Sequence, residues 1–203
     1  SCLDGSSAAS DVYKRQDQGV LQVGNAANPG AVFGGQVTVA NGAGLTGNGS
    51  VGALVNNGSV TPDNGKLTVA GNFTNGSTGA LNLLITPSST GSLAVGGTAN
   101  LGGTLNVVNL APYAGPATYT LLTAGAVNGT FGTTNLENLA FLNTALNYSP
   151  TQVALAVSRN NVSYASVAAT GNQRGVAAAL DSGAAVGGAT VPVSYTHLTL
   201  PTS

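Results

Sequence analysis

Apolar and polar residues alternate in short runs along most of the chain, from about residue 20 to residue 158. Runs such as GVLQV, GQVTVA, GALNLLI and TQVALAVS are separated by glycine and asparagine. In KLTVAGNF, Leu67 and Val69 lie two positions apart, which places both side chains on one face of a strand. The pattern predicts many short β-strands, each with one buried face, joined by tight turns.

A diverged internal repeat runs through the middle of the chain. LTVAGNFTNGSTGALNLLI aligns with LAVGGTANLGGTLNVVNL, so that Leu67 matches Leu93 and Leu81 matches Leu105. The offset between the copies shrinks from 26 to 24 residues. Upstream, QVTVANGAGLTGNG offers a weaker third copy. A period of this length, made of strands, indicates a solenoid.

The repeat favours an all-β fold of the parallel β-helix type for residues 17–160. In such a coil, each strand stacks on its counterpart one turn away, about 4.8 Å along the axis. Glycine and asparagine suit the turns because both tolerate left-handed backbone conformations. An antiparallel β-sandwich is the competing interpretation.

The pattern changes near residue 160 and becomes alanine-rich. In NVSYASVAATGNQRGVAAALDSG, Val176 and Leu180 are four residues apart, which is a helical spacing. Thr170 and Gln173 fit a capping box at a helix start, and Gly183 fits a helix end. We expect one short helix at about 171–182 within a linker that spans 161–190.

The two ends of the chain differ in character from the rest. SSAASDVYKRQ, at residues 6–16, can be encoded by codons whose reverse complement translates as VSYTHLTLPT, the residues at 193–202. No folding constraint produces this relation, which resembles a sequencing adapter translated on both strands. We therefore expect 1–16 and 193–203 to be non-biological sequence, with 1–16 disordered, and the remainder to be a fragment of a longer protein.

Composition excludes several classes of function. The 203 residues include five Lys and Arg against six Asp and Glu, with a formal net charge of −1. That balance offers no electrostatic surface for nucleic acid or an anionic membrane. The chain is 42% hydrophobic, which separates it from disordered chains. Aromatic residues make up only 5%, so the core must be built from Val, Leu and Ile.

Few residues could carry catalysis. The single cysteine, Cys2, and the single histidine, His197, both fall in the excluded ends. Without them no Ser-His-Asp or Cys-His arrangement is possible. The remaining acids are far apart in the sequence: Asp17, Asp63, Glu137 and Asp181. We therefore predict no catalytic, cofactor-binding or metal-binding residue, no cofactor, and no enzyme activity or dedicated small-molecule substrate within this segment.

The sequence resembles the autotransporters, the type V secreted proteins of Gram-negative bacteria. GLTGNGSVGALVNNGSVTP and LGGTLNVVNLAPYAGPATYTLLTA are similar to the stem of the exported passenger. VNGTFGT and LAFLNTALNYSPTQVALAV are similar to its last strands. SVAATGNQRGVAAALDS resembles the linker, with Gly171 where the family often has proline. The resemblance implies a right-handed parallel β-helix at the cell surface, tethered to the outer membrane. It implies one partner, the protein's own translocator β-barrel of about a dozen strands, which would follow the linker.

On this resemblance we expect a structural stem that supports export and displays an upstream head domain. Folding would proceed from the C-terminal coils, each added strand finding a ready template. The candidate residues for this seed are all apolar: Leu105, Val107, Leu121, Leu122, Phe131, Phe141, Leu142, Val153, Leu155 and Val157. Two alternatives stay open. One is an adhesin surface whose asparagine and threonine rows bind host or bacterial glycans, and the other is the scaffold of a secreted enzyme whose catalytic domain lies upstream.

Overall fold

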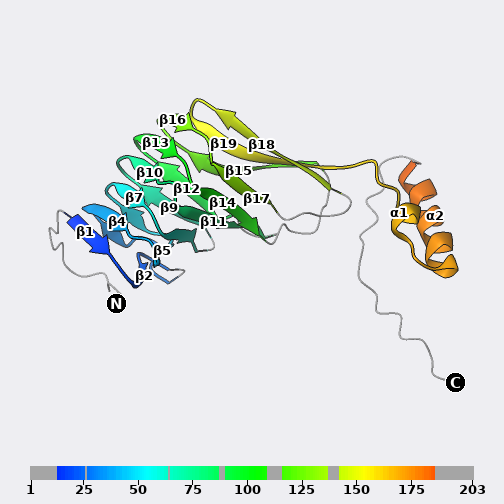
Figure 1. The fold of residues 1–203 in the computed structure, drawn as a ribbon, viewed down its shortest axis with the longest axis horizontal. Helices are drawn as coiled ribbons and strands as arrows, with labels where there is room; N and C mark the ends of the chain where they lie inside the picture. The colour runs from blue at the N-terminus through cyan, green and yellow to red at the C-terminus, as the bar shows by residue number, and fades with distance from the viewer. Residues whose placement is uncertain are drawn as a thin grey trace, which may run out of the picture.

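The chain winds into a parallel β-helix whose coils contribute strands to three sheets (Figure 1). We analysed a computed structural model, which describes residues 13–25, 27–63, 65–86, 90–108, 116–136 and 142–185. Strand pairing is parallel throughout the coils and antiparallel only at the C-terminal end. The predicted all-β parallel β-helix with a C-terminal helix is confirmed, and the antiparallel sandwich is wrong.

Each sheet takes every third strand of the chain. The first sheet holds β1 (Tyr13–Gln16), β4 (Gln36–Val39), β7 (Leu54–Asn56), β10 (Phe73–Asn75), β13 (Thr98–Leu101) and β16 (Ala126–Gly129). The second sheet holds β2 (Gly19–Gln22), β5 (Ala43–Gly47), β8 (Ser59–Pro62), β11 (Ala80–Leu84), β14 (Thr104–Val108) and β17 (Thr133–Leu136). The third sheet holds β3 (Val32–Phe33), β6 (Ser50–Val51), β9 (Lys66–Val69), β12 (Ser92–Val95), β15 (Ala117–Thr123), β19 (Gln152–Arg159) and β18 (Leu142–Ser149).

The core is the interior of the coil, filled by the apolar member of each alternating run. Leu67 and Val69 are fully buried on β9, while the residues beside them face outward. Successive coils bring like residues into contact, because parallel in-register pairing stacks equivalent positions. The core contains mostly Val and Leu, with Phe33, Phe73 and Phe131 as its buried aromatic residues. The period-two interpretation of the sequence is therefore confirmed.

The register of the internal repeat is also confirmed. Leu67 pairs with Leu93 between β9 and β12, and Leu81 pairs with Leu105 between β11 and β14. The weaker third copy, QVTVANGAGLTGNG, covers β4 and β5. These strands lie in the same two sheets as β10 and β11 of the first stronger copy.

Two asparagines lie inside the coil, at the corner between the first and second sheets. Asn56 and Asn75 are 0% and 3% exposed, and the Asn56 Nδ2 donates to the Asn75 Oδ1 at 2.7 Å. The Asn75 Nδ2 also donates to the main-chain oxygens of Gly79 (3.1 Å) and Gly102 (2.6 Å). The two amides bond to each other and to main-chain oxygens at this corner, so these buried polar groups are satisfied. No pattern in the sequence distinguishes these two asparagines from the others.

One corner position requires glycine. Gly103 has φ +58°, and an added Cβ would lie 2.2 Å from the oxygen of Gly79 and 2.4 Å from that of Gly76. The tight corner therefore excludes any side chain there, in addition to favouring the left-handed backbone.

The N-terminal segment departs from expectation. Residues 1–16 were expected to be disordered, but Tyr13–Gln16 forms β1 and pairs in parallel with β4 from Tyr13↔Gln36 to Gln16↔Val39. The Gln16 oxygen also accepts from the Ala40 N–H at 2.9 Å. The physical reason is the open main-chain edge of β4, which an extended segment satisfies. Residues 1–12 and 193–203 lie outside the described part of the chain. The pairing of β1 with β4 shows the conformation of Tyr13–Gln16 and does not test whether this segment is biological sequence.

Two helices follow the coils and stand apart from them in Figure 1: α1 (Tyr164–Val167) and α2 (Gly171–Ala185). The predicted capping box is confirmed, since the Gln173 N–H donates to the Thr170 Oγ1 at 3.2 Å and the Thr170 N–H donates to the Gln173 Oε1 at 3.0 Å. The predicted end is wrong, because α2 continues through Gly183 to Ala185. Neither described helix is long and apolar enough to cross a membrane.

The short helix α1 was not predicted. Ser163 caps it, and the Asp181 carboxylate on α2 accepts the N–H groups of Tyr164 (2.9 Å) and Ala165 (3.1 Å). A carboxylate at a helix start satisfies free N–H groups and complements their partial positive charge. The Arg159 guanidinium, at the end of β19, lies 4.6 Å from the centre of the Tyr164 ring. These contacts join the last strand to the helical pair.

Replacing Asn75 by alanine should lower the free energy of unfolding by about 1–3 kcal/mol, because Asn56 and two main-chain oxygens would lose buried partners. Asn100→Ala is the matched control, since the Asn100 amide pairs with Asn128 on the exposed surface. It should change stability by less than about 0.5 kcal/mol. Urea denaturation of both variants measures the difference, and equal effects would contradict a structural role for the buried amides.

Candidate functional site: the C-terminal cap of the β-helix

The last coil leaves a row of main-chain groups that no further coil pairs, and the chain closes part of this row with a hairpin. β18 and β19 form an antiparallel pair over their full length, and β19 pairs with β15. The hairpin turn, Pro150 and Thr151, contacts β16, the last strand of the first sheet, and the residues just before it. There the Pro150 oxygen accepts the Val127 N–H at 2.7 Å, and the Thr151 oxygen accepts the Ala124 N–H at 2.9 Å. One hairpin thus pairs along the third sheet through β19 and bonds to the end of the first sheet through its turn.

The strand β15 is the junction between coil and hairpin. Leu122 pairs in parallel with Leu93 on one side and antiparallel with Val153 on the other. The register shifts between Thr120 and Leu122, so Leu121 is an extra residue on β15. Such a bulge lets consecutive side chains point to the same side, and Leu121 and Leu122 are both buried, at 1% and 0% exposure. The bulge keeps both leucines in the core at the strand where the sheet changes from parallel to antiparallel pairing.

The inner face of the hairpin closes the end of the core. Val153, Leu155 and Val157 on β19 are 0%, 0% and 5% exposed, and Leu142 and Leu146 on β18 are half-buried against them. The candidate seed residues that are buried are Leu105, Val107, Leu121, Leu122, Phe131, Val153, Leu155 and Val157. Leu142 is partly exposed, and Phe141 lies outside the described residues. The structure gathers most of the predicted set around one end of the coil.

We call the hairpin of β18 and β19, with the end of the core that it closes, the cap. Tyr148 belongs to the cap but was not among the predicted residues. Its hydroxyl accepts the Phe131 main-chain N–H at 3.3 Å, joining β18 to the loop before β17. Burial raises the pKa of the Tyr148 phenol, and the hydrogen bond from Phe131 lowers it by a smaller amount. Tyr148 lies near the end of β18, close to the Pro150–Thr151 turn, and no pattern in the sequence indicates its contact with Phe131.

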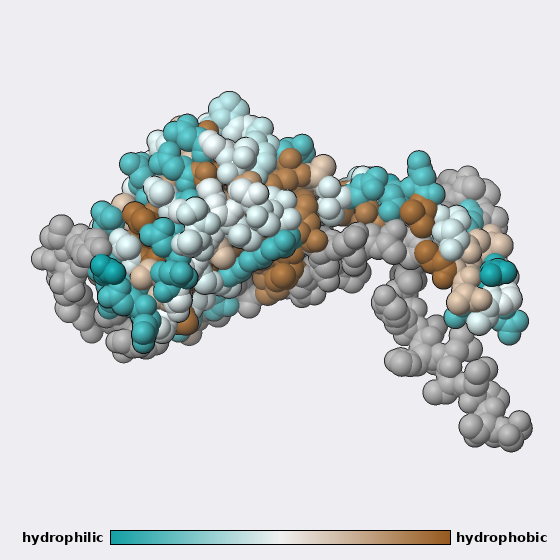
Figure 2. All heavy atoms as spheres, viewed as in Figure 1, coloured by the Kyte–Doolittle hydropathy of each residue, from teal (hydrophilic) through white to brown (hydrophobic). Residues whose placement is uncertain are grey.

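The outer face of the second sheet carries the expected asparagine and threonine rows. The Asn135 Nδ2 donates to the Asn106 Oδ1 (2.7 Å), and the Asn106 Nδ2 donates to the Asn82 Oδ1 (2.6 Å). Asn82 in turn donates to Ser59 (2.8 Å) and Thr61 (3.1 Å). These amides bond to one another along the axis, so their first role is to stabilise the stack. An open depression on this face is lined by residues that include Val20, Gly44 and Thr61. Figure 2 shows the hydropathy of the molecular surface.

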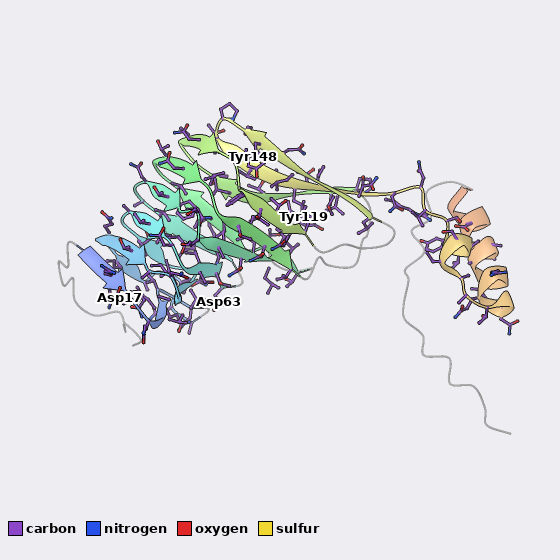
Figure 3. All side chains as sticks on the ribbon, in the orientation of Figure 1. Asp17, Asp63, Tyr119 and Tyr148 are labelled. Carbon is purple, nitrogen blue, oxygen red and sulfur yellow. The ribbon has the colours of Figure 1, made fainter. Side chains whose placement is uncertain are left out.

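The acidic residues do not come together. Asp17 pairs with Arg15 at 2.5 Å, and Asp181 caps α1. Figure 3 shows Asp17 and Asp63 near the N-terminal coils, away from Tyr119 and Tyr148 at the cap. Glu137 lies outside the described residues. Among the described residues, no group of three or more His, Cys, Asp or Glu could hold a metal ion.

No protein-family model matches the chain, and no curated protein matches it.

The raised pKa of Tyr148 predicts a loss of stability in alkali. A phenol that is harder to ionise when folded stabilises the fold fully below its unfolded pKa, near 10.0, and this contribution is lost as the pH rises through the higher folded pKa. Thermal melts between about pH 8 and about pH 11 should therefore fall more steeply for the unchanged protein than for Tyr148→Phe. Parallel curves for the two proteins would contradict this assignment.

Proposed function

We propose that this chain is the membrane-proximal stem of an autotransporter passenger, and that its C-terminal cap seeds folding during export. The observation that carries the proposal is the hairpin bonded to β15, because it combines a closed core with an ordered strand on which the next coil can pair. The localisation that follows is the cell surface of a Gram-negative bacterium. The partner is the protein's own translocator barrel, with the helical pair leading towards it.

The cap is the part of the coil whose contacts are most local in sequence. Only Pro150 and Thr151 separate β18 from β19, whereas Asn56 and Asn75, neighbours in adjacent coils, are 19 residues apart and Asn100 and Asn128 are 28 apart. Closing a short loop costs less chain entropy than closing a long one. A hairpin that forms early then supplies an edge for β15, and β15 supplies one for β12. Folding in this order would run from the C-terminal end of the stem towards its N-terminal end.

The burial of the cap supports the same direction. Figure 2 shows apolar side chains gathered at the end of the coils nearest the helices. Burial of Leu121, Leu122 and Val153 joins hairpin and coil in one core. Each fully buried aliphatic side chain contributes about 1.5–3 kcal/mol, so the cap needs few additional coils to become stable. A stem with this property would retain each exported segment outside the membrane by folding it.

The seed role predicts that damage at the cap impairs export more than equal damage elsewhere. Leu155→Asp places a charge in the cap core, and Leu45→Asp does so in an early coil, where Leu45 is also buried at 1% exposure. Either charge costs several kcal/mol locally. We expect Leu155→Asp to reduce the surface yield of the chain fused to an autotransporter translocator, as measured by protease accessibility on intact cells. Leu45→Asp should reduce it much less.

Ser158→Asp, on the exposed side of β19, controls for the added charge itself and should leave the yield unchanged. Equal losses for Leu155→Asp and Leu45→Asp would remove the directional part of the proposal. An unaffected yield for Leu155→Asp would remove the seed role entirely.

A further inference from the structure

The hairpin closes the coil but ends the third sheet with a new edge. β18 is the terminal strand of that sheet, and within the described part of the chain nothing pairs with its outer side. In an antiparallel ladder every second residue directs its N–H and C=O away from its partner strand. The outer side of β18 therefore presents a row of main-chain donors and acceptors along eight residues.

This edge lacks the features that normally keep edge strands apart. Proteins protect exposed edges with lysine or other charges, proline, bulges or very short strands. β18 reads LNTALNYS, with no charged residue and no proline, and its pairing with β19 has no bulge. The other terminal strands are shorter: β3 has two residues, and β1, β2, β16 and β17 have four each. β18 is thus the longest unprotected edge among the described strands.

The side chains along this edge are mostly apolar on the inner face, where Thr144 is the polar exception. Leu142 and Leu146 pack against the core but stay partly exposed, and Tyr148 is 37% exposed. The outer face carries Asn143, Ala145 and other small uncharged residues, all exposed. A strand added to this edge would cover the exposed part of the leucines and extend the inner face of the sheet. The edge therefore favours an uncharged partner strand that is apolar on one face only.

We propose that β18 pairs with β18 of a second copy of this chain, antiparallel, about a two-fold axis at Ala145. In this register Leu142 lies opposite Tyr148 of the other copy, and Thr144 lies opposite Leu146. Opposed residues share a face, so the inner apolar row of one copy continues that of the other. Aromatic–aliphatic and β-branched cross-strand pairs each stabilise a sheet by about 0.2–1 kcal/mol.

The outer face of the joined sheet is complementary as well. Asn143 of one copy lies opposite Asn147 of the other, where their amides can bond as the amides of Asn82 and Asn106 do within the coil. Ala145 meets its own counterpart on the axis, with no bulk or charge to separate the strands. An isologous interface of this kind closes after two copies, because each edge is used once. The dimer does not depend on the proposed export function.

Sedimentation velocity of the purified chain, carrying Cys2→Ser to remove the native thiol, tests the dimer. We expect dimers that dissociate on dilution. Ala145→Lys puts two like charges face to face and should raise the dissociation constant about tenfold or more. Thr118→Lys is the matched control: Thr118 is exposed on β15 and pairs with Ala156, which also pairs with Ala145, so it lies on the same face but away from the edge. It should dimerise like the parent.

A disulfide test checks the register and does not depend on how the lysine variant folds. Directly opposed Cα atoms in an antiparallel pair are about 4.5–5.5 Å apart, which lies within disulfide range. Ala145→Cys in the Cys2→Ser chain should therefore give a covalent dimer under mild oxidation, and Thr118→Cys should not. A parent that stays monomeric at high concentration, or Thr118→Cys cross-linking as fully as Ala145→Cys, would overturn the proposal. Surface display unaffected by Ala145→Lys would leave the export proposal standing.

Discussion

The structure depends on main-chain hydrogen bonds between successive coils. No coil has an internal partner for its own strands, so each is stable only when its neighbour is in place. The pairing of β9 with β12, and of β11 with β14, supplies both main-chain partners and the stacking of Leu67 on Leu93 and Leu81 on Leu105. Everything else in the fold either holds this ladder in register or ends it.

In-register stacking also explains why the chain is nearly uncharged. Equivalent residues of adjacent coils are about 4.8 Å apart, so a repeated charge would face a like charge in every coil. Asparagine and threonine avoid this repulsion and bond along the column instead, as Asn82, Asn106 and Asn135 do outside the coil and Asn56 and Asn75 do inside it. Among the described residues, Lys14 and Arg15 lie together on the terminal strand β1, and Lys66 is alone on β9. The other described charges are Asp17 and Asp63 between strands, Arg159 at the end of β19, and Arg174 and Asp181 on α2.

The sequence predicted the inner faces and the repeat register well, because a period of two is a direct consequence of strand geometry. It did not predict which asparagines face inward, since Asn56 and Asn100 look alike until the corner is built. Coil length varies because corner loops can hold different numbers of residues, so the offset between copies of the repeat is not constant. The helix α1 has only four residues and depends on Asp181, which lies well beyond it in the sequence.

The direction of the last two strands was the most informative part that the sequence analysis left unresolved. Two residues, Pro150 and Thr151, join β18 to β19, and a link this short permits only antiparallel pairing. β19 runs antiparallel to both of its neighbours, β15 and β18, so these last two strands end the series of parallel coils. The reversal satisfies β15 and closes the core, yet it transfers the unpaired row of main-chain groups to β18. A cap built from a strand moves an edge outward without removing it, so the side chains of that last strand decide what the molecule can pair with.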